Sequence, residues 1–395
     1  MSAAYVIDAI RTPIGKYGGS LAGIRPDDLL AHVIKALLKK HPELDLNDIE
    51  DVIAGDANQA GEDNRNVARM AALLAGLPVS VAGNTVNRLC ASGLQAIMDT
   101  SRAVMCNEGD IYIAGGVESM TRAPFVMLKH ATPWSRTPDM MDTTIGWRFP
   151  NPKLTDKYYP YSMGETAENV AVQWKISREE QDDFAFHSHA KYFKAKGEGK
   201  FNDEIVPVEI NGGHEPFADD EHPRKTTMEK LASLKPAFSK SGSVTAGNSS
   251  GLNDGAAAML IASENALSKY NFKPLARVVS MAVAGVDPSI MGIGPVPATQ
   301  KALSRANLDI SDIDLIELNE AFASQSIACI RQLGLDPAKV NVNGGSIALG
   351  HPLGCSGVRI SATLLYEMQK RRSRYGLATM CVGVGQGAAI IYERI

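Results

Sequence analysis

The apolar residues of the chain fall into two kinds of pattern, which predict two kinds of element. Short continuous runs at Ala4–Ile10 and Ile49–Ala54 predict strands, whereas apolar residues at helical spacing from Pro26 to Lys40 predict an amphipathic helix. The same reasoning predicts one more strand and two more helices, at Asp110–Ala114, Asn64–Leu74 and Leu94–Met105. Because strands alternate with helices, the pattern predicts an α/β layered fold with a largely parallel sheet.

The second half of the chain repeats the first. Asp312-Ile313 echoes Asp48-Ile49 ahead of a strand, and Ser356-Gly357 echoes Ser92-Gly93 at the start of a helix. The two shifts agree, because 312 minus 48 and 356 minus 92 both give 264. An equal shift in the same structural context predicts an internal duplication, with two similar halves that each form a sheet covered by helices.

The segment between the halves, residues 122–243, is rich in Pro, Trp, Tyr, His, Lys and Arg. The pair Ser177 and Glu180 predicts a capped helix, and most of the remaining segment is expected to be irregular. Long irregular insertions in compact enzymes are usually functional, so we expect a substrate-binding loop domain; the alternative is a mere dimer contact. The predicted division is a first half at 1–121, completed by about 244–270, a loop domain at 122–243 and a second half at 271–395.

Composition and charge exclude several classes of protein. The chain has 395 residues, of which 45% are hydrophobic and 21% charged, and its net charge is −4. These values give no electrostatic case for binding nucleic acid or a membrane surface. Its five cysteines include no Cys-x-x-Cys pair, which argues against a disulfide framework or a zinc site and for a reducing compartment. With no signal peptide or membrane-spanning run in the sequence, the cytoplasm is the expected location.

The first candidate for chemistry is Cys90. It follows a short strand and a polar Asn87-Arg88 turn, and a helical pattern begins around Ala91. Backbone N–H groups and the positive end of the helix dipole at this position favour a thiolate, so we expect a nucleophile with a lowered pKa. A buried and inert cysteine is the structural alternative.

Two polar candidates follow in the second half. Asn319 comes after the predicted strand Asp314–Ile316, and an amide at a strand end could hold a water or a substrate oxygen, although it could equally cap a helix. His351 lies in the glycine-dense stretch 343–354, which matches neither nucleotide-binding pattern. Histidine is the natural base for a thiol, and the surrounding glycines leave space for a ligand.

The last candidate segment joins a second thiol to alternate glycines. Cys381 ends a predicted strand and is followed by Gly383, Gly385 and Gly387. A thiol at this point could move a proton, and the freed N–H groups could form an oxyanion hole.

Taken together, these segments resemble thiolases, the family that makes or cleaves 3-ketoacyl-CoA, over essentially the whole chain. The signature segments are Asn87–Gly93, Ala246–Ala256, Asn319–Phe322, Gly350–Pro352 and Cys381–Gly383. The resemblance implies a five-layer αβαβα fold from two similar halves, with the loop domain over the CoA site. It also implies a homodimer or homotetramer, acyl-CoA and CoA as the ligands, CoA as a co-substrate, no bound cofactor and no metal.

The resemblance also assigns catalytic roles. Cys90 is the acyl-accepting nucleophile, His351 activates it, and Cys381 is the second acid/base, which moves the proton at the substrate's α-carbon. Asn319 holds a water that joins His351 in one oxyanion hole. The backbone N–H groups of Cys90 and Gly383 form the other.

Substrate-binding residues are carried over in the same way. The resemblance places Ser250 and Ala246 against the pantetheine arm and Arg224 near the adenine. Met163 and Met291 are expected beside the acyl group, with ordinary core packing as the alternative for both. The remaining residue assigned to the substrate side is Phe322.

The segment Asp142–Arg148 resembles members that act on 3-oxoadipyl-CoA, where an arginine could meet a terminal carboxylate. We therefore favour a degradative 3-ketoacyl-CoA thiolase with ping-pong kinetics through an acyl-enzyme on Cys90. A hydratase or dehydrogenase subunit is a possible partner. The sequence does not give the acyl chain length.

Three other functions stay open at this stage. A biosynthetic thiolase would condense two acetyl-CoA, but such members have His before the Met-Gly pair where this chain has Ser162 before Met163. Ketoacyl synthases share the fold but use two histidines, whereas this chain has Cys381 at the second acid/base position. A non-catalytic carrier of acyl-CoA or lipid would tolerate loss of Cys90, His351 or Cys381, and all three are present.

Overall fold

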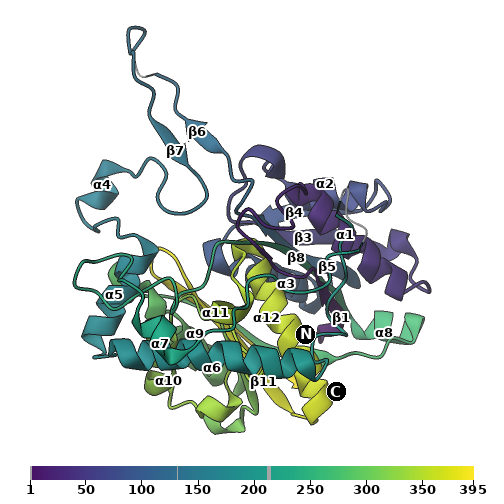
Figure 1. Ribbon diagram of the computed structural model, residues 1–395. Coiled ribbons are helices and arrows are strands. Elements are labelled where there is room, and N and C mark those ends of the chain that lie inside the picture. Colours follow the sequence, from purple (N-terminus) through teal and green to yellow (C-terminus); the bar gives the residue numbers. More distant parts are fainter. Residues whose placement is uncertain (1, 131, 211–214) are drawn as a thin grey trace.

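The computed structural model describes residues 2–130, 132–210 and 215–395 (Figure 1). Its strands form a ten-stranded hydrogen-bonded array, and the first half of the fold is built on five neighbouring strands of this array. The order of these strands is β4-β3-β5-β8-β1. β3 runs parallel to β4 and β5, whereas β8 is antiparallel to both β5 and β1. Their bounds are Tyr5–Arg11 for β1, Ile49–Gly55 for β3, Ala82–Val86 for β4, Ile111–Ser119 for β5 and Asn253–Ala262 for β8.

The second half repeats this connectivity in the order β10-β11-β12-β9. β10 is parallel to β11, and the remaining pairs are antiparallel, so β10, β11, β12 and β9 correspond to β3, β5, β8 and β1. The two sheets join where Tyr5 and Val6 pair with Arg277 and Ala276. The predicted similarity of the halves is therefore confirmed. Their bounds are Ala276–Gly285 for β9, Leu315–Leu318 for β10, Tyr375–Val382 for β11 and Gln386–Arg394 for β12. The prediction of a largely parallel sheet is wrong, because among the described strands β1, β8, β9 and β12 pair antiparallel with their neighbours and the parallel pairs are β3–β4, β3–β5 and β10–β11.

Two helices, α3 (Ser92–Met105) and α12 (Leu353–Arg371), form the central layer between the sheets (Figure 1). One hydrophobic cluster joins them to both sheets: Leu94 and Ile97 of α3 and Val358 of α12 pack with Met259 of β8 and Met380 of β11. Burial of such side chains is the main favourable term in folding. This shared core fixes the starts of both helices relative to the strand ends.

The outer layers complete the five-layer order. α1 (Pro26–Lys40) and α2 (Val67–Leu74) pack their apolar faces on the first sheet, and α9 (Pro295–Ala306) and α10 (Ala323–Leu333) cover the second. Each pair has its own hydrophobic cluster, separate from the central one. The αβαβα order is thus present as expected.

The segment between the halves contains a projecting hairpin and several helices. The hairpin strands β6 (Phe125–Met127) and β7 (Met140–Asp142) extend away from the layers (Figure 1). Ser177 and Glu180 form the predicted capping box at the start of α6. The helices here are α4 (Pro152–Thr155), α5 (Met163–Gln173), α6 (Arg178–Gly197) and α7 (Met228–Ala232).

The remaining elements are short. They are β2 (Gly15–Lys16), α8 (Glu264–Tyr270), α11 (Ser346–Leu349) and 3-10 helices at Leu46–Asp48, Gly61–Asp63, Leu89–Ala91, Pro288–Ile293, Ile310–Asp312 and Pro337–Lys339. Across the described part of the chain, none of the helices combines the length and apolar character that crossing a membrane requires.

Candidate active site

Cys90 lies in a tight turn between β4 and α3. Leu89 has φ +47°, a left-handed conformation that is uncommon for a residue with a side chain. Two polar neighbours hold it there: the Leu89 N–H donates to Asn87 Oδ1 at 2.8 Å, and Ser92 Oγ donates to the Leu89 carbonyl at 2.6 Å. Ser92 Oγ also accepts the Arg88 N–H at 2.9 Å. The turn thus places Cys90 just before the helix, as the sequence predicts.

The expectation of a lowered pKa for Cys90 is wrong for the resting protein. Burial raises the pKa of this thiol above its ordinary value, and the nearby Glu118 carboxylate acts in the same direction. The backbone N–H groups of Gly383 and of Cys90 itself bond to the sulfur and lower the pKa, but burial outweighs them. The thiol is therefore neutral at rest, and attack on a substrate needs a base.

Gly383 begins a turn that follows β11. The next two residues, Val384 and Gly385, have φ +62° and +77°, so the chain reverses sharply into β12. The turn directs the Gly383 N–H at the Cys90 sulfur. Together with the Cys90 N–H, it supplies two donors where an oxyanion would form during acyl transfer.

Cys381 lies at the end of β11 and is fully buried. Burial and the neighbouring Cys90 raise the pKa of its thiol well above the ordinary value, so both sulfurs are protonated at rest. An apolar cluster surrounds it, and this cluster brings Met291 and Phe322 together with Met163 packed against them. Three residues assigned to the substrate by resemblance therefore line the same place as Cys381.

His351 and Asn319 form the second polar group. Asn319 follows β10, and its Nδ2 lies 3.3 Å from His351 Nε2. The other ring nitrogen of His351 lies 2.6 Å from Ser356 Oγ. Burial, followed by the positive charge of Arg359, lowers the pKa of His351 to about 3. The imidazole is therefore neutral at ordinary pH and can accept a proton.

Glu118, which no motif in the sequence indicates, connects the segment after His351 with residues near the Cys90 turn. Its carboxylate accepts the Gly354 N–H at 2.8 Å and the N–H groups of Ala57 and Asn58 at 3.0 and 3.1 Å. Gly354 lies three residues after His351. Burial raises the pKa of Glu118 to about 7. No short motif signals this residue, because its partners come from other parts of the chain.

The residues assigned to CoA also come together. Arg224 Nη2 donates to the Ala246 carbonyl at 3.3 Å, and both residues are exposed. The Ser250 N–H donates to the Ala321 carbonyl at 3.0 Å, next to Phe322. The loop that carries Ala246 and Ser250 thus runs from the surface toward the apolar cluster around Cys381.

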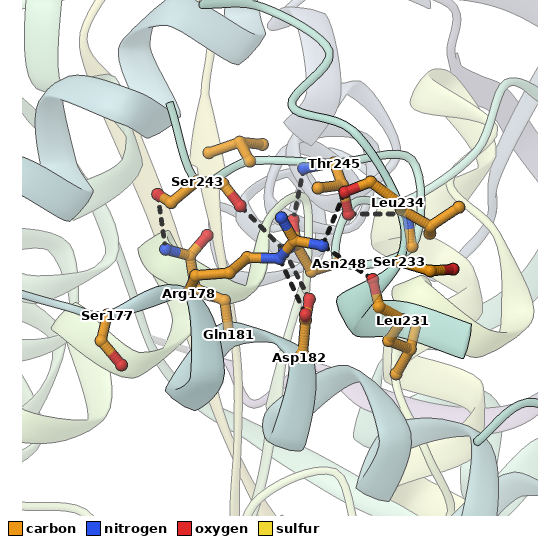
Figure 2. A network of polar contacts seen from close by, with 12 residues as sticks. Ser177, Arg178, Gln181, Asp182, Leu231, Ser233, Leu234, Ser243, Thr245 and Asn248 are labelled. Carbon is orange, nitrogen blue, oxygen red and sulfur yellow. Dashed lines mark hydrogen bonds and ion pairs between the residues drawn. The ribbon is translucent and has the colours of Figure 1, made fainter. Parts of the chain in front are cut away.

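A buried polar network anchors this loop to α6 (Figure 2). Asn248 Nδ2 donates to Asp182 Oδ1 at 2.9 Å, and its Oδ1 accepts the Thr245 N–H at 2.8 Å. Asp182 also accepts Arg178 Nε at 2.7 Å, and Arg178 Nη2 bonds the carbonyls of Leu231 and Leu234. Asn248 lies within the Ala246–Ala256 segment, but nothing in the sequence points to Arg178 or Asp182.

Arg148 of the loop domain is connected by hydrogen bonds to residues that adjoin the Cys90 turn. Its guanidinium donates to the Asn58 carbonyl and side chain at 3.1 and 3.0 Å and to the Thr143 carbonyl at 3.1 Å. The adjacent Ala57 carbonyl accepts from Asn87, which holds the Cys90 turn. The Arg148 guanidinium is therefore held by these hydrogen bonds close to the turn, and its positive charge has a fixed position.

Comparison with known proteins finds matches along nearly the whole chain. The family model "Thiolase, N-terminal domain" matches residues 4–265, and "Thiolase, C-terminal domain" matches residues 272–394. The chain is 55% identical to the "3-oxoadipyl-CoA/3-oxo-5,6-dehydrosuberyl-CoA thiolase" of Escherichia coli K12 over 100% of both chains.

Solved structures share both the fold and the sequence. The human mitochondrial 3-ketoacyl-CoA thiolase in complex with CoA superposes with a TM-score of 0.93 at 43% identity, covering 100% of this chain and 98% of that one. The acetyl-CoA acetyltransferase of Bacillus anthracis gives 0.94 at 42%, covering 100% and 99%. The expected fold and the expected acyltransferase class are confirmed, and the chain belongs to the thiolase family.

Proposed function

We propose that the preferred substrate is a 3-oxoacyl-CoA with a terminal carboxylate, 3-oxoadipyl-CoA, and that Cys90 carries the acyl group. The relative at 55% identity is named for this substrate. The segment 142–148 supports the same choice, because it holds the Arg148 charge near the Cys90 turn. A fixed cation stabilises a carboxylate through a charge-assisted contact.

In the first half-reaction, Cys90 Sγ attacks the 3-keto carbon while His351 Nε2 takes the thiol proton. We assign the N–H groups of Cys90 and Gly383 to one negatively charged oxygen, and a water held by Asn319, together with His351, to the other; the contacts of Gly383 with Cys90 and of Asn319 with His351 support this assignment. The bond between C2 and C3 then breaks, and its electron pair forms the enolate of acetyl-CoA. The Cys381 thiol gives its proton to C2, which releases acetyl-CoA and leaves a succinyl thioester on Cys90.

In the second half-reaction, free CoA regenerates the enzyme. The Cys381 thiolate takes the proton of the CoA thiol, and the CoA sulfur attacks the thioester carbonyl. Cys90 leaves as a thiolate and recovers its proton from His351. Two thioester steps replace one difficult Claisen cleavage, so ping-pong kinetics are expected.

The observation that carries this mechanism is that Gly383 and Cys381, both from the second half of the chain, lie close to the Cys90 sulfur. The N–H of Gly383, from the second half of the chain, bonds Cys90 of the first half, and the Cys381 thiol is close enough to interact with it electrostatically. We extend the proposal to the CoA side: Ser250 and Ala246 contact the pantetheine arm, and Arg224 lies near the adenine. The bond from Arg224 to the Ala246 carbonyl supports this arrangement.

The test is intact-mass spectrometry after mixing the protein with 3-oxoadipyl-CoA in the absence of free CoA. A succinyl mass gain mapped to Cys90, with release of acetyl-CoA, is expected, and Cys90→Ser should show neither. Acetoacetyl-CoA and longer linear substrates in parallel report the preferred acyl group. An unmodified protein with intact acyl-CoA bound would overturn the proposed mechanism and favour a carrier.

We propose further that the protein is a homo-oligomer of the cytoplasm. The hairpin β6–β7 exposes Phe125, Trp134 and Met140, with Trp134 88% exposed, and a second copy of the chain would cover them. All five cysteines are free, as a reducing compartment predicts.

A further inference from the structure

We infer that Arg359 and Ser346 are positioning residues that set the orientation of the Asn319 amide and, through it, the tautomer of His351. This inference rests on the catalytic roles proposed for Asn319 and His351. Neither Arg359 nor Ser346 touches the reacting atoms. Both act through a continuous chain of hydrogen bonds that starts at Arg359 and passes through the base, His351.

The chain of hydrogen bonds is short and buried. Arg359 Nη2 donates to Ser346 Oγ at 2.6 Å, and Ser346 Oγ lies 2.6 Å from Asn319 Oδ1. Asn319 Nδ2 then lies 3.3 Å from His351 Nε2, and His351 Nδ1 lies 2.6 Å from Ser356 Oγ. Ser356 Oγ reaches the Pro352 carbonyl at 2.8 Å. Each of the five side chains is buried.

Donor and acceptor chemistry gives this chain one direction. A guanidinium can only donate, so Ser346 Oγ accepts from Arg359, and its own hydrogen goes to Asn319 Oδ1, which can only accept. The amide nitrogen of Asn319 is then the atom that faces His351 Nε2, and it requires an acceptor there.

The hydrogen bonds on the other side of His351, to Ser356 and the Pro352 carbonyl, run in the direction that gives the same tautomer. The Pro352 carbonyl can only accept, so it takes the hydroxyl hydrogen of Ser356, and Ser356 Oγ accepts from His351 Nδ1–H. Both ends therefore place the ring proton on Nδ1 and the lone pair on Nε2. Nε2 is the atom that must accept the Cys90 proton, so the chain selects the reactive tautomer.

Arg359 is suited to start this chain of hydrogen bonds because few hydrogen bonds or negative charges compensate its own positive charge. The side chain is fully buried, and its Nε and Nη1 have no hydrogen-bond partner in the part of the chain that the structure describes. The Glu317 carboxylate is 4.0 Å away from Nη1, beyond hydrogen-bonding distance. A buried cation this poorly paired is costly to keep, which argues for a use beyond stability. Its field also opposes a second proton on His351.

The test compares two buried serines. Ser346→Ala breaks the chain of hydrogen bonds. Ser361→Ala removes another buried hydroxyl, on α12 and outside that chain of hydrogen bonds, where Ser361 Oγ donates to the Gly357 carbonyl at 2.9 Å and accepts from the Tyr392 hydroxyl at 3.0 Å. For Ser346→Ala we expect kcat to fall about tenfold with KM for the 3-oxoacyl-CoA nearly unchanged, since one directing hydrogen bond is lost. Nitrogen chemical shifts of labelled His351 should show a second tautomer beside the Nδ1–H form, because only the Ser356 end then favours Nδ1–H. Ser361→Ala should change neither.

Arg359→Met removes the donor and the charge and is expected to give the same signature. If that variant does not fold, Ser346→Ala still decides the matter. The inference is overturned if Ser346→Ala keeps the wild-type kcat and His351 tautomer, or if its kinetic change matches that of Ser361→Ala. Acylation of wild-type Cys90 is measured separately, so failure of the proposed function would show in the wild-type protein alone.

Discussion

Gly93 and Gly357, which the internal repeat predicts to be equivalent, meet where α3 crosses α12. A Cβ atom on Gly93 would lie 2.5 Å from the Gly354 carbonyl oxygen, and one on Gly357 would overlap the backbone nitrogen of Leu94. The two central helices therefore touch through their backbones. This crossing holds together the starts of α3 and α12, beside which Cys90 and His351 lie.

The first prediction is that Gly357→Ala destabilises the fold. The added methyl group has only backbone to displace, so we expect the free energy of unfolding to fall by about 1–3 kcal/mol, the usual cost of overpacking a core. Denaturant titration followed by fluorescence measures the loss. Gly23→Ala is the control, because a Cβ there meets nothing within 4 Å. Equal stability of the two variants would contradict a backbone contact at the crossing.

The ease of predicting each element follows from how its residues are buried. Helix α1 was predicted with its observed bounds, since it is amphipathic and starts with Pro26 at its first turn. Strand β8, by contrast, was not predicted. It contains Ala256, Ala257 and Ala258, and alanine has low strand propensity, but the strand lies between β1 and β5 and is buried along its whole length.

The residues of the candidate site also differ in how well the sequence predicts them. Residues in compact motifs, Cys90 and His351 among them, were identified because a short segment holds both the side chain and its turn. Glu118 and Arg359 were missed, because each acts through hydrogen bonds to residues distant in the sequence. The pKa of Cys90 was predicted in the wrong direction, since a sequence shows the start of a helix but not the depth of burial.

The second prediction concerns the pH dependence of Cys90 alkylation. The Cys90 thiol has a raised pKa and the His351 imidazole a lowered pKa, so both stay neutral, and only the thiolate reacts with iodoacetamide. The alkylation rate should therefore rise continuously from pH 6 to above pH 8 (roughly the range over which an ordinary thiol begins to ionise). A plateau near pH 6 would instead indicate a thiolate–imidazolium pair at rest.

Peptide mapping makes this measurement specific, because Cys106 is exposed and will also react. Cys106 serves as the internal control for an ordinary surface thiol. At neutral pH, the rate at Cys90 in the absence of substrate should stay below the rate at Cys106.

The third prediction addresses the network that anchors the loop of Ala246 and Ser250, which we propose to contact CoA. Asp182→Asn removes the charge that pairs with Arg178 and weakens the bond to Asn248. We expect KM for CoA to rise about tenfold with a smaller change in kcat, because a charge-assisted hydrogen bond is lost but the catalytic groups are untouched. Initial rates at varied CoA give both constants. Asp183→Asn is the control, since Asp183 is the next residue of α6 and its side chain is exposed. Equal KM values in the two variants would contradict an anchoring role.

The fourth prediction tests the substrate preference. Arg148→Met removes the fixed charge near the Cys90 turn, so kcat/KM should fall about tenfold more for 3-oxoadipyl-CoA than for acetoacetyl-CoA, which has no terminal carboxylate. Lys153→Met, at an exposed position of α4, is the control for a lost surface charge. An equal fall for both substrates would show that Arg148 only supports the loop that contains it.

The fifth prediction concerns assembly through the hairpin β6–β7. A two-stranded hairpin is marginally stable alone, yet this one projects from the layers (Figure 1), and several of its apolar side chains are exposed. Contact between hairpins of different copies would bury these side chains. The double substitution Trp134→Ser with Met140→Ser should therefore lower the molecular mass in analytical ultracentrifugation to that of a smaller assembly.

The control for the hairpin is Val172→Ser, which removes an apolar side chain that is 78% exposed on α5, away from the hairpin strands. This variant should sediment as the wild type does. Thermal unfolding of the double variant should occur at a lower temperature and depend less on protein concentration, because an interface that forms only between folded copies stabilises them by mass action. If the double variant keeps the wild-type mass, the prediction is wrong: copies of the chain associate through another surface, and the exposed hairpin has no role in assembly.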